Sequence, residues 1–152
     1  MAESSDKTEA VPLVQTAAFG RFALIAILVG FSLLGFSYLS SDFWLDEMLT
    51  VVDYASSDDI TTIFRHYPVA NNHILYSAVL WVWLNLVPGA LEVGARLPCF
   101  VMAVATLCCM YLIGRSLMDR AAGFFMALLM GFSPIYLGFF YQMRGYGLAI
   151  LL

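Results

Sequence analysis

Three long stretches of this sequence contain no charged residue, and they limit most strongly how the chain can fold. Residues 22–39 and 97–114 are each 18 residues long, and residues 121–140 form a third stretch. A helix of about 20 apolar residues is needed to cross a hydrocarbon core of ~30 Å. The chain is 62% hydrophobic and only 12% charged, unlike an ordinary soluble domain. We therefore predict an all-α, polytopic transmembrane helical bundle.

The segments between these stretches predict the domain organisation. Residues 1–18 are polar and acidic and are expected to form a disordered cytoplasmic tail. Residues 19–152 would form the membrane domain, with spans at about 22–39, 97–114, 121–140 and from 146 onward. Residues 40–96 are expected to be an extracytoplasmic loop with interfacial helices, because the apolar run 74–87 is only 14 residues long and too short to span comfortably.

The distribution of arginines favours one orientation. If the run 74–87 lies in the membrane interface, Arg21, Arg115 and Arg120 all face the cytoplasm, as the positive-inside tendency expects. If that run crossed the membrane, Arg115 and Arg120 would instead face outward. The preferred arrangement gathers five other polar residues on the outer side: Asp46, Glu47, His73, Arg96 and Arg144.

The first part of the loop has the pattern of an amphipathic helix. Asp46, Thr50 and Asp53 recur at helical spacing over residues 43–54, which predicts one face turned to water. A second short helix is expected to begin at Ser57 and to stop before Pro68. The opposite, membrane-facing side of the first helix would carry Trp44, Met48, Val51 and Val52.

These five residues are of the types that a group-transfer reaction at the membrane surface would need. An arginine can hold a phosphate through paired hydrogen bonds. A carboxylate can accept the proton of an attacking hydroxyl, and adjacent carboxylates could also hold a divalent cation. Spacing alone does not choose among these roles, and no cofactor is certain. The net charge of −4 suggests no nucleic-acid partner.

Five motifs of the chain resemble those of the GT-C membrane glycosyltransferases, a group that includes protein O-mannosyltransferases and the aminoarabinose transferase of lipid A. They occur in the family's order over about residues 20–152. The Asp-Glu motif of that group follows the first membrane helix. The matching segments here are Trp44-Leu45-Asp46-Glu47, Asn72-His73-Ile74-Leu75-Tyr76, Leu91-Glu92-Val93-Gly94-Ala95-Arg96-Leu97-Pro98, Gly114-Arg115-Ser116-Leu117 with Ala122-Gly123, and Ser133-Pro134 with Gln142-Met143-Arg144-Gly145-Tyr146.

The resemblance implies transfer of a sugar from a polyprenyl-phosphate-linked donor to a lipid, glycan or protein hydroxyl, on the outer face of a bacterial plasma membrane. It implies Asp46 and Glu47 as catalytic residues, and Arg96 and Arg144 as contacts to the donor phosphate. His73 would contact the acceptor or a cation. The family's paired prolines after the histidine are absent here, and Gln142 stands where the family has a glutamate.

Two other function classes remain open at this point. Family members are several hundred residues long, so the chain looks like the amino-terminal part of an enzyme, expected to be inactive alone. It could instead be a non-catalytic membrane subunit or a degenerate fragment that packs against a partner. A transporter is less favoured, because transporters place ionisable residues within their spans, and the spans predicted here are uncharged.

Overall fold

The chain is helical throughout the part that the structure describes. The computed structural model describes residues 17–65, 73–87 and 91–152, and every regular element within them is a helix. The all-α prediction is therefore confirmed for these residues. Most of the predicted tail, residues 1–16, lies outside the described residues, while residues 17 and 18 already belong to the first helix.

Among the described residues, two helices are long and apolar enough to cross a membrane: α1 (Ala17–Leu39) and α5 (Leu91–Leu117). Helix α5 begins before the predicted span 97–114, so residues 91–96 belong to the helix and not to the loop. Pro98 lies inside α5 and cannot donate to the carbonyl of Gly94, four residues earlier. The indole Nε1 of Trp83 donates to that carbonyl at 2.9 Å instead, so the acceptor stays satisfied.

The predicted span 121–140 is divided in the structure into two helices, at the step from Ser133 to Pro134. Helix α6 (Arg120–Gly131) is about 18 Å long at 1.5 Å per residue. Helix α7 (Pro134–Phe139) follows, with Pro134 as its first residue and Ser133 at its N-cap. Proline suits the first position of a new helix but interrupts a helix that is already running, which explains the break. Helix α8 (Tyr146–Leu151) is the last element.

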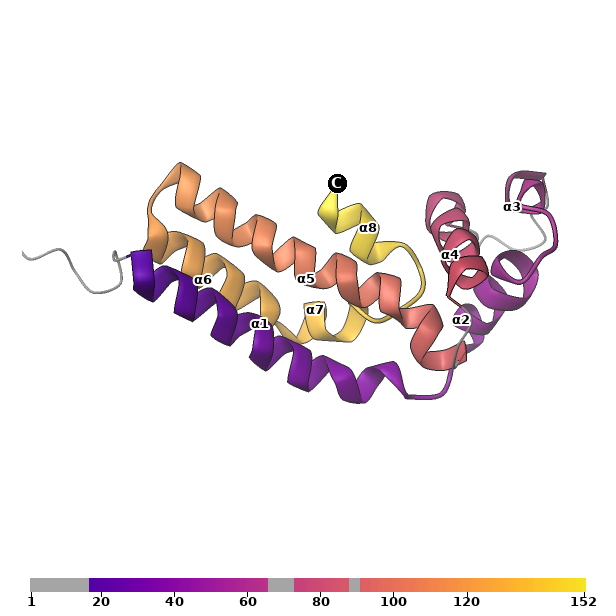
Figure 1. The fold of residues 1–152 in the computed structure, drawn as a ribbon, viewed down its shortest axis with the longest axis horizontal. Helices are drawn as coiled ribbons and strands as arrows, with labels where there is room; N and C mark the ends of the chain where they lie inside the picture. Colours follow the sequence, from indigo (N-terminus) through magenta and orange to yellow (C-terminus); the bar gives the residue numbers. More distant parts are fainter. Residues whose placement is uncertain (1–16, 66–72, 88–90) are drawn as a thin grey trace, which may run out of the picture.

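Helices α1, α5 and α6 lie side by side along the long axis of the molecule (Figure 1). They alternate in direction: a Cβ on Gly20, at the start of α1, would lie within 4 Å of Tyr111 near the end of α5 and of Arg120 at the start of α6. Arg21 and Arg120 therefore share one end, which we call the basic end. Between the helices is a buried apolar cluster of Ile27, Phe31, Ala103, Leu107, Tyr111, Ala127, Tyr136, Phe140 and Tyr141.

Four short helices gather beyond the other end of α1 (Figure 1). They are α2 (Leu45–Leu49), the π-helix η2 (Thr50–Ala55), α3 (Thr61–Arg65) and α4 (Ile74–Leu86). Helix α4 has 13 residues, in agreement with the short apolar run expected there. Helices η2 and α4 share a second buried cluster with the first turns of α5 and with the segment before α8. Its members are Val51, Ala55, Tyr76, Leu80, Ala95, Cys99 and Met143.

Helix α3 begins four residues later than predicted. Ser57 does not cap it, because the Ser57 hydroxyl donates to the carbonyls of Tyr54 and Asp59. The carboxylate of Asp59 accepts from the backbone N–H of Thr61 at 2.9 Å and takes the capping role. Pro68, the predicted stop, and Asn72, in the histidine motif, lie outside the described residues.

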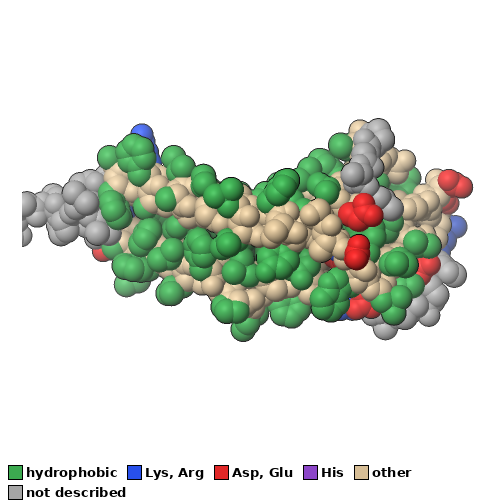
Figure 2. Space-filling model, turned by 90° about the horizontal axis from the view of Figure 1, so that it is seen from below, with side chains coloured by type: hydrophobic (Ala, Val, Ile, Leu, Met, Phe, Trp, Pro, Cys, Tyr) green, Lys and Arg blue, Asp and Glu red, His purple; other side chains and the backbone are tan. Residues whose placement is uncertain are grey.

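The surface of the elongated body is mostly hydrophobic. Figure 2 shows hydrophobic side chains along its length, with most of the acidic side chains gathered towards the short helices. Large apolar side chains of α1 are exposed along the whole helix: Phe22, Ile25, Val29, Leu33, Leu34 and Phe36. A monomer in water rarely exposes so continuous an apolar surface, so this surface suits contact with lipid or with further helices.

Candidate functional site

The structure brings the five predicted site residues to one end of the molecule. Asp46 and Glu47 lie in α2, His73 precedes α4, Arg96 lies in the second turn of α5, and Arg144 lies between α7 and α8. We call this set the outer cluster. The cluster divides into a buried ion pair and a more exposed ion pair, and these differ in what they can do chemically.

Glu47 and Arg96 form the buried pair. The Glu47 and Arg96 side chains are 1% and 0% exposed, and Arg96 Nη2 lies 2.6 Å from Glu47 Oε2. Arg96 Nε donates to the other carboxylate oxygen at 3.3 Å, so the guanidinium holds the carboxylate with two parallel bonds. Because α5 begins earlier than predicted, Arg96 is not at the start of a span but inside a helix that packs against the loop.

The remaining N–H groups of Arg96 are directed at backbone carbonyls where α1 ends. Helix carbonyls at a C-terminus lack partners within the helix and carry partial negative charge, so a cation there is stabilised. The guanidinium carbon also lies 5.1 Å from the centre of the Phe43 ring. Each nitrogen of Arg96 thus has an acceptor within the protein, and the buried group presents no face to a bound phosphate. The carbonyl acceptors are those of Tyr38, Leu39, Ser41 and Asp42.

Both oxygens of the Glu47 carboxylate also accept hydrogen bonds from the backbone. Its Oε2 accepts from the backbone N–H of Trp44 at 3.0 Å, which caps the start of α2. Its Oε1 accepts from the backbone N–H of Met143 at 3.2 Å. Glu47 therefore links α2, α5 and the segment before α8. Neither its burial nor its partners fit a carboxylate that faces substrate.

Asp46 and Arg144 form the more exposed pair. Arg144 Nη1 lies 3.1 Å from Asp46 Oδ2, and the side chains are 28% and 44% exposed for arginine and aspartate. The Arg144 guanidinium also lies 5.9 Å from the centre of the Tyr146 ring. The two adjacent carboxylates of the Asp-Glu motif thus bind different arginines. Of the predicted site residues, Asp46 and Arg144 are the two that combine charge with access to solvent.

His73 lies beside this pair. Its ring contacts the ring of Tyr146 edge-on, with the centroids 5.7 Å apart. Partial burial, and next the nearby Arg144 guanidinium, lower the pKa of His73 below its ordinary value of 6.5. The imidazole is therefore neutral near pH 7 and can accept or donate one hydrogen bond. It occupies the N-cap position of α4 without a capping hydrogen bond from its side chain.

Gly145 and Tyr146 were not predicted as site residues, but the structure places both beside the outer cluster. Gly145 has φ +71° and its Cα lies so close to α4 that a Cβ would be 3.2 Å from Tyr76 Cβ and 3.3 Å from His73 Cβ. A glycine directly after an arginine, between two apolar runs, is a turn signal that could have indicated this bend. Tyr146 closes the last motif of the predicted resemblance, which could have drawn attention to its ring.

The predicted water-facing side of residues 43–54 is wrong in part. Asp46 and Asp53 are partly exposed, but Thr50 is buried. Trp44, Met48 and Val52 are exposed, which is compatible with the predicted membrane-facing side, whereas Val51 is 2% exposed and packs in the second core cluster. From Thr50 onward the segment is π-helical, and Ser56 N–H donates to the Val51 carbonyl, five residues back, at 2.8 Å. This wider turn rotates the faces away from the 3.6-residue period.

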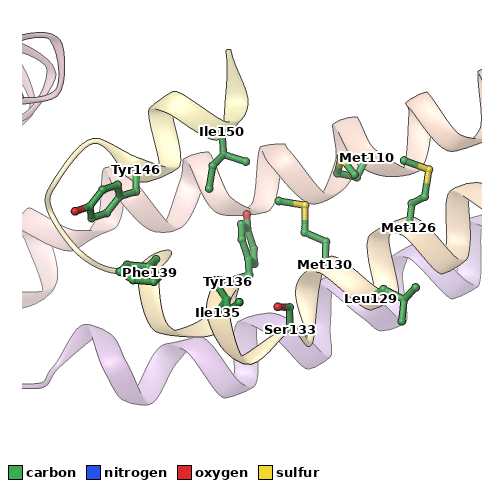
Figure 3. Close-up of a pocket in the computed structure, with 10 residues that line it drawn as sticks. All are labelled: Met110, Met126, Leu129, Met130, Ser133, Ile135, Tyr136, Phe139, Tyr146 and Ile150. Carbon is green, nitrogen blue, oxygen red and sulfur yellow. The ribbon is translucent and has the colours of Figure 1, made fainter.

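An apolar groove of about 810 Å³ runs between α5, α6, α7 and α8 (Figure 3). Its hydroxyl-bearing members are Ser133, Tyr136 and Tyr146, and the Tyr136 hydroxyl already donates to the Ala103 carbonyl at 2.9 Å. Tyr146 lines the groove and also contacts Arg144 and His73, so it lies between the groove and the outer cluster. The other lining residues are Met110, Met126, Leu129, Met130, Ile135, Phe139 and Ile150.

The described residues define a helical protein with two helices able to cross a membrane and a cluster of acidic and basic residues at one end of the molecule. Within those residues, no three side chains of His, Cys, Asp or Glu form a group that could hold a metal ion. No family model, curated protein or solved structure matches the chain. The resemblance to the GT-C glycosyltransferases therefore stays a prediction from the motifs.

Proposed function

We propose that these residues belong to a GT-C type membrane glycosyltransferase, which moves a sugar from a polyprenyl-phosphate-linked donor to a hydroxyl group at the outer face of a bacterial plasma membrane. The observation that carries the proposal is the Asp46–Arg144 pair. It is a carboxylate and a guanidinium, partly exposed and 3.1 Å apart, at one end of a body with two helices apolar enough to cross a membrane. A lipid-linked donor would place its phosphate at such a level in the membrane.

The chemistry assigns one role to each member of the pair. The Asp46 carboxylate accepts the proton of the acceptor hydroxyl while the hydroxyl oxygen bonds to the anomeric carbon of the sugar. The bond from that carbon to the phosphate oxygen breaks, and the polyprenyl phosphate leaves with the electron pair. Arg144 is suited to stabilise the charge that develops on the leaving phosphate. Neutral His73 would hydrogen-bond the acceptor.

The membrane location of the site is part of the proposal. With the basic end in the cytoplasm, the outer cluster faces outward, where lipid-linked sugar donors meet extracytoplasmic acceptors. Arg21 and Arg120 share the basic end, and Arg115 lies in the last turn of α5 beside Gly123 of α6. This distribution agrees with the positive-inside tendency and supports the orientation.

The test is transfer by the full-length protein reconstituted into liposomes. Radiolabelled polyprenyl-phosphate mannose, glucose and arabinose would each be offered, with membranes from a strain that lacks the gene as the acceptor source. We expect label to move from one donor into lipid, glycan or protein. Asp46→Asn should lower the initial rate by about 100-fold or more, the range of a lost general base.

Asp58→Asn is the matched control, because Asp58 is an exposed aspartate of the same loop. It should transfer at the wild-type rate. Full activity of Asp46→Asn would remove Asp46 from the mechanism. If the wild-type protein transfers none of the three sugars, the proposal fails in favour of a non-catalytic membrane subunit, a role that the exposed apolar face of α1 would suit.

A further inference from the structure

We propose that Glu47 and Arg96 are positioning residues, which together set the separation of Asp46 and Arg144. An effect of Glu47 and Arg96 on sugar transfer rests on the proposed function. Their effect on the distance between Asp46 and Arg144 does not. It replaces the predicted contact between Arg96 and a donor phosphate with a contact to the protein itself. Three observations carry it.

The first observation is that the Asp46–Arg144 pair lacks the burial that would hold it in place. Both side chains are partly exposed, and an ion pair in contact with water contributes little to its own stability. The two residues lie on elements that are far apart in sequence, α2 and the turn before α8. Their separation must therefore be set by other contacts between these two segments.

The second observation is that Glu47 joins the same two segments one residue away. Glu47 follows Asp46 in α2, and Met143 precedes Arg144 in the turn. The Met143 N–H donates to Glu47 Oε1 at 3.2 Å, and this bond is fully buried. It therefore joins the residue next to Asp46 directly to the residue next to Arg144. One buried carboxylate thus fixes the position of α2 relative to the turn that carries Arg144.

The third observation is that Arg96 leaves Glu47 little freedom. Its two bonds to the carboxylate orient both oxygens, and its remaining N–H groups are held by carbonyls at the end of α1 and just after it. The Phe43 and Tyr141 rings lie 5.1 and 5.9 Å from the guanidinium carbon. Loss of the pair should therefore loosen the outer cluster without removing any group that touches substrate.

The structural part can be tested without any activity assay. Asp46→Cys and Arg144→Cys would be introduced into the full-length protein with Cys99→Ser, Cys108→Ala and Cys109→Ala, and cross-linked with a short bismaleimide in liposomes. Glu47→Gln, which removes the charge but keeps the shape, should slow cross-linking several-fold. Glu47→Ala should slow it further, and an unchanged rate in both variants would overturn the proposal.

Leu107→Ala controls for general loss of stability. Leu107 is fully buried in the core between the long helices, far along α5 from Arg96, and its truncation leaves a cavity there. It should lower the thermal midpoint yet leave the rate of cross-linking between positions 46 and 144 unchanged. Equal slowing by Leu107→Ala would show that the cross-link reports only global loosening, and the proposal would fall.

The kinetic part separates positioning from contact with the donor. With the transferred donor, Glu47→Gln should lower kcat by about tenfold to a hundredfold, as small misplacements do, and leave KM for the donor unchanged. A raised KM with unchanged kcat would show a donor contact and overturn the proposal. If cross-linking slows as expected but the wild-type protein transfers no sugar, the proposed function fails while the structural role of the pair stands.

Discussion

Gly114 of α5 and Gly123 of α6 face each other in a close contact between the two helices. A Cβ on Gly123 would lie 2.4 Å from the Tyr111 carbonyl oxygen, and one on Gly114 would lie 2.7 Å from Gly123 Cα. Both obstacles are backbone atoms, which cannot turn aside as a side chain can. Small residues at this crossing therefore allow the hairpin of α5 and α6 to close, as they do between membrane helices in general.

Replacing Gly123 should open this crossing. We expect Gly123→Ala to destabilise the protein by about 1–3 kcal/mol, the cost of overpacking a filled interface, measured as a lower thermal midpoint in detergent. Gly138→Ala is the matched control, since nothing lies within 4 Å of a Cβ on Gly138 in α7. Its midpoint should equal or exceed that of the wild type, and equal losses in the two variants would contradict the explanation.

Breaking the buried Glu47–Arg96 pair should lower the free energy of unfolding more than removing a surface arginine does. Arg96→Met leaves the Glu47 carboxylate buried without its counter-ion, which typically costs about 3–5 kcal/mol. Arg96→Lys keeps the charge but cannot reach both the carboxylate and the carbonyls after α1, so it should recover only part of the loss. Arg65→Met, at an exposed arginine of α3, should have little effect. Chemical denaturation in mixed micelles would compare the three variants.

Gly145 should tolerate no side chain. Its φ of +71° is a left-handed conformation, which costs other residues about 1–2 kcal/mol. A Cβ would also press on Tyr76 and His73 of α4. Gly145→Ala should therefore lower both the stability and the rate of sugar transfer, whereas Gly94→Ala, with open space around its Cβ, should change neither. Wild-type behaviour of Gly145→Ala would contradict the described turn.

His73 should make the stability depend on pH in one direction. Because burial and Arg144 lower its pKa in the folded state, the unfolded chain binds this proton more readily. The contribution of His73 to the free energy of unfolding is thus fully present above its ordinary pKa of 6.5. It is lost progressively as the pH falls below that value, until the folded histidine is protonated too.

Thermal midpoints measured between pH 5 and pH 8 on the wild type and on His73→Asn would show this, over the range in which histidine titrates. The difference between the two proteins should change with pH, and in the wild-type protein the acid side should be the less stable. Arg144→Gln should reduce the change, since Arg144 is the second cause of the lowered pKa. If the difference in thermal midpoint between the wild type and His73→Asn stays constant over this range, His73 is not the source of the pH dependence.

The two ends of the molecule should be reached from opposite sides of a membrane. Met118 and Asp58 are both exposed, the first at the basic end and the second among the short helices. In a protein without its native cysteines, Asp58→Cys should react with a membrane-impermeant maleimide on intact cells. Met118→Cys should react only after the cells are opened. Labelling of both positions on intact cells would rule out the proposed orientation.

The sequence by itself determined which segments are helical and where several of them begin. If charge-free stretches of 18 residues enter a membrane, their backbone N–H and C=O groups must form hydrogen bonds within the protein. A helix forms these hydrogen bonds within the segment itself. Local signals set some boundaries equally well. The Asp119 carboxylate accepts from the Ala122 N–H at 2.8 Å and caps α6, and Pro134 opens α7. Such signals act over one helical turn and can be read from neighbouring residues.

Only the tertiary structure decided what each charged residue of the outer cluster does. The Asp-Glu motif predicted two similar carboxylates, but the fold buries Glu47 against Arg96, 49 residues away, and leaves Asp46 partly exposed. The fold also buries Thr50, which the helical period had placed on the water-facing side, and the left-handed Gly145 turns the chain directly after Arg144. The cost of burying a charge depends on partners that become neighbours only when the chain has folded, so no local pattern could assign these roles.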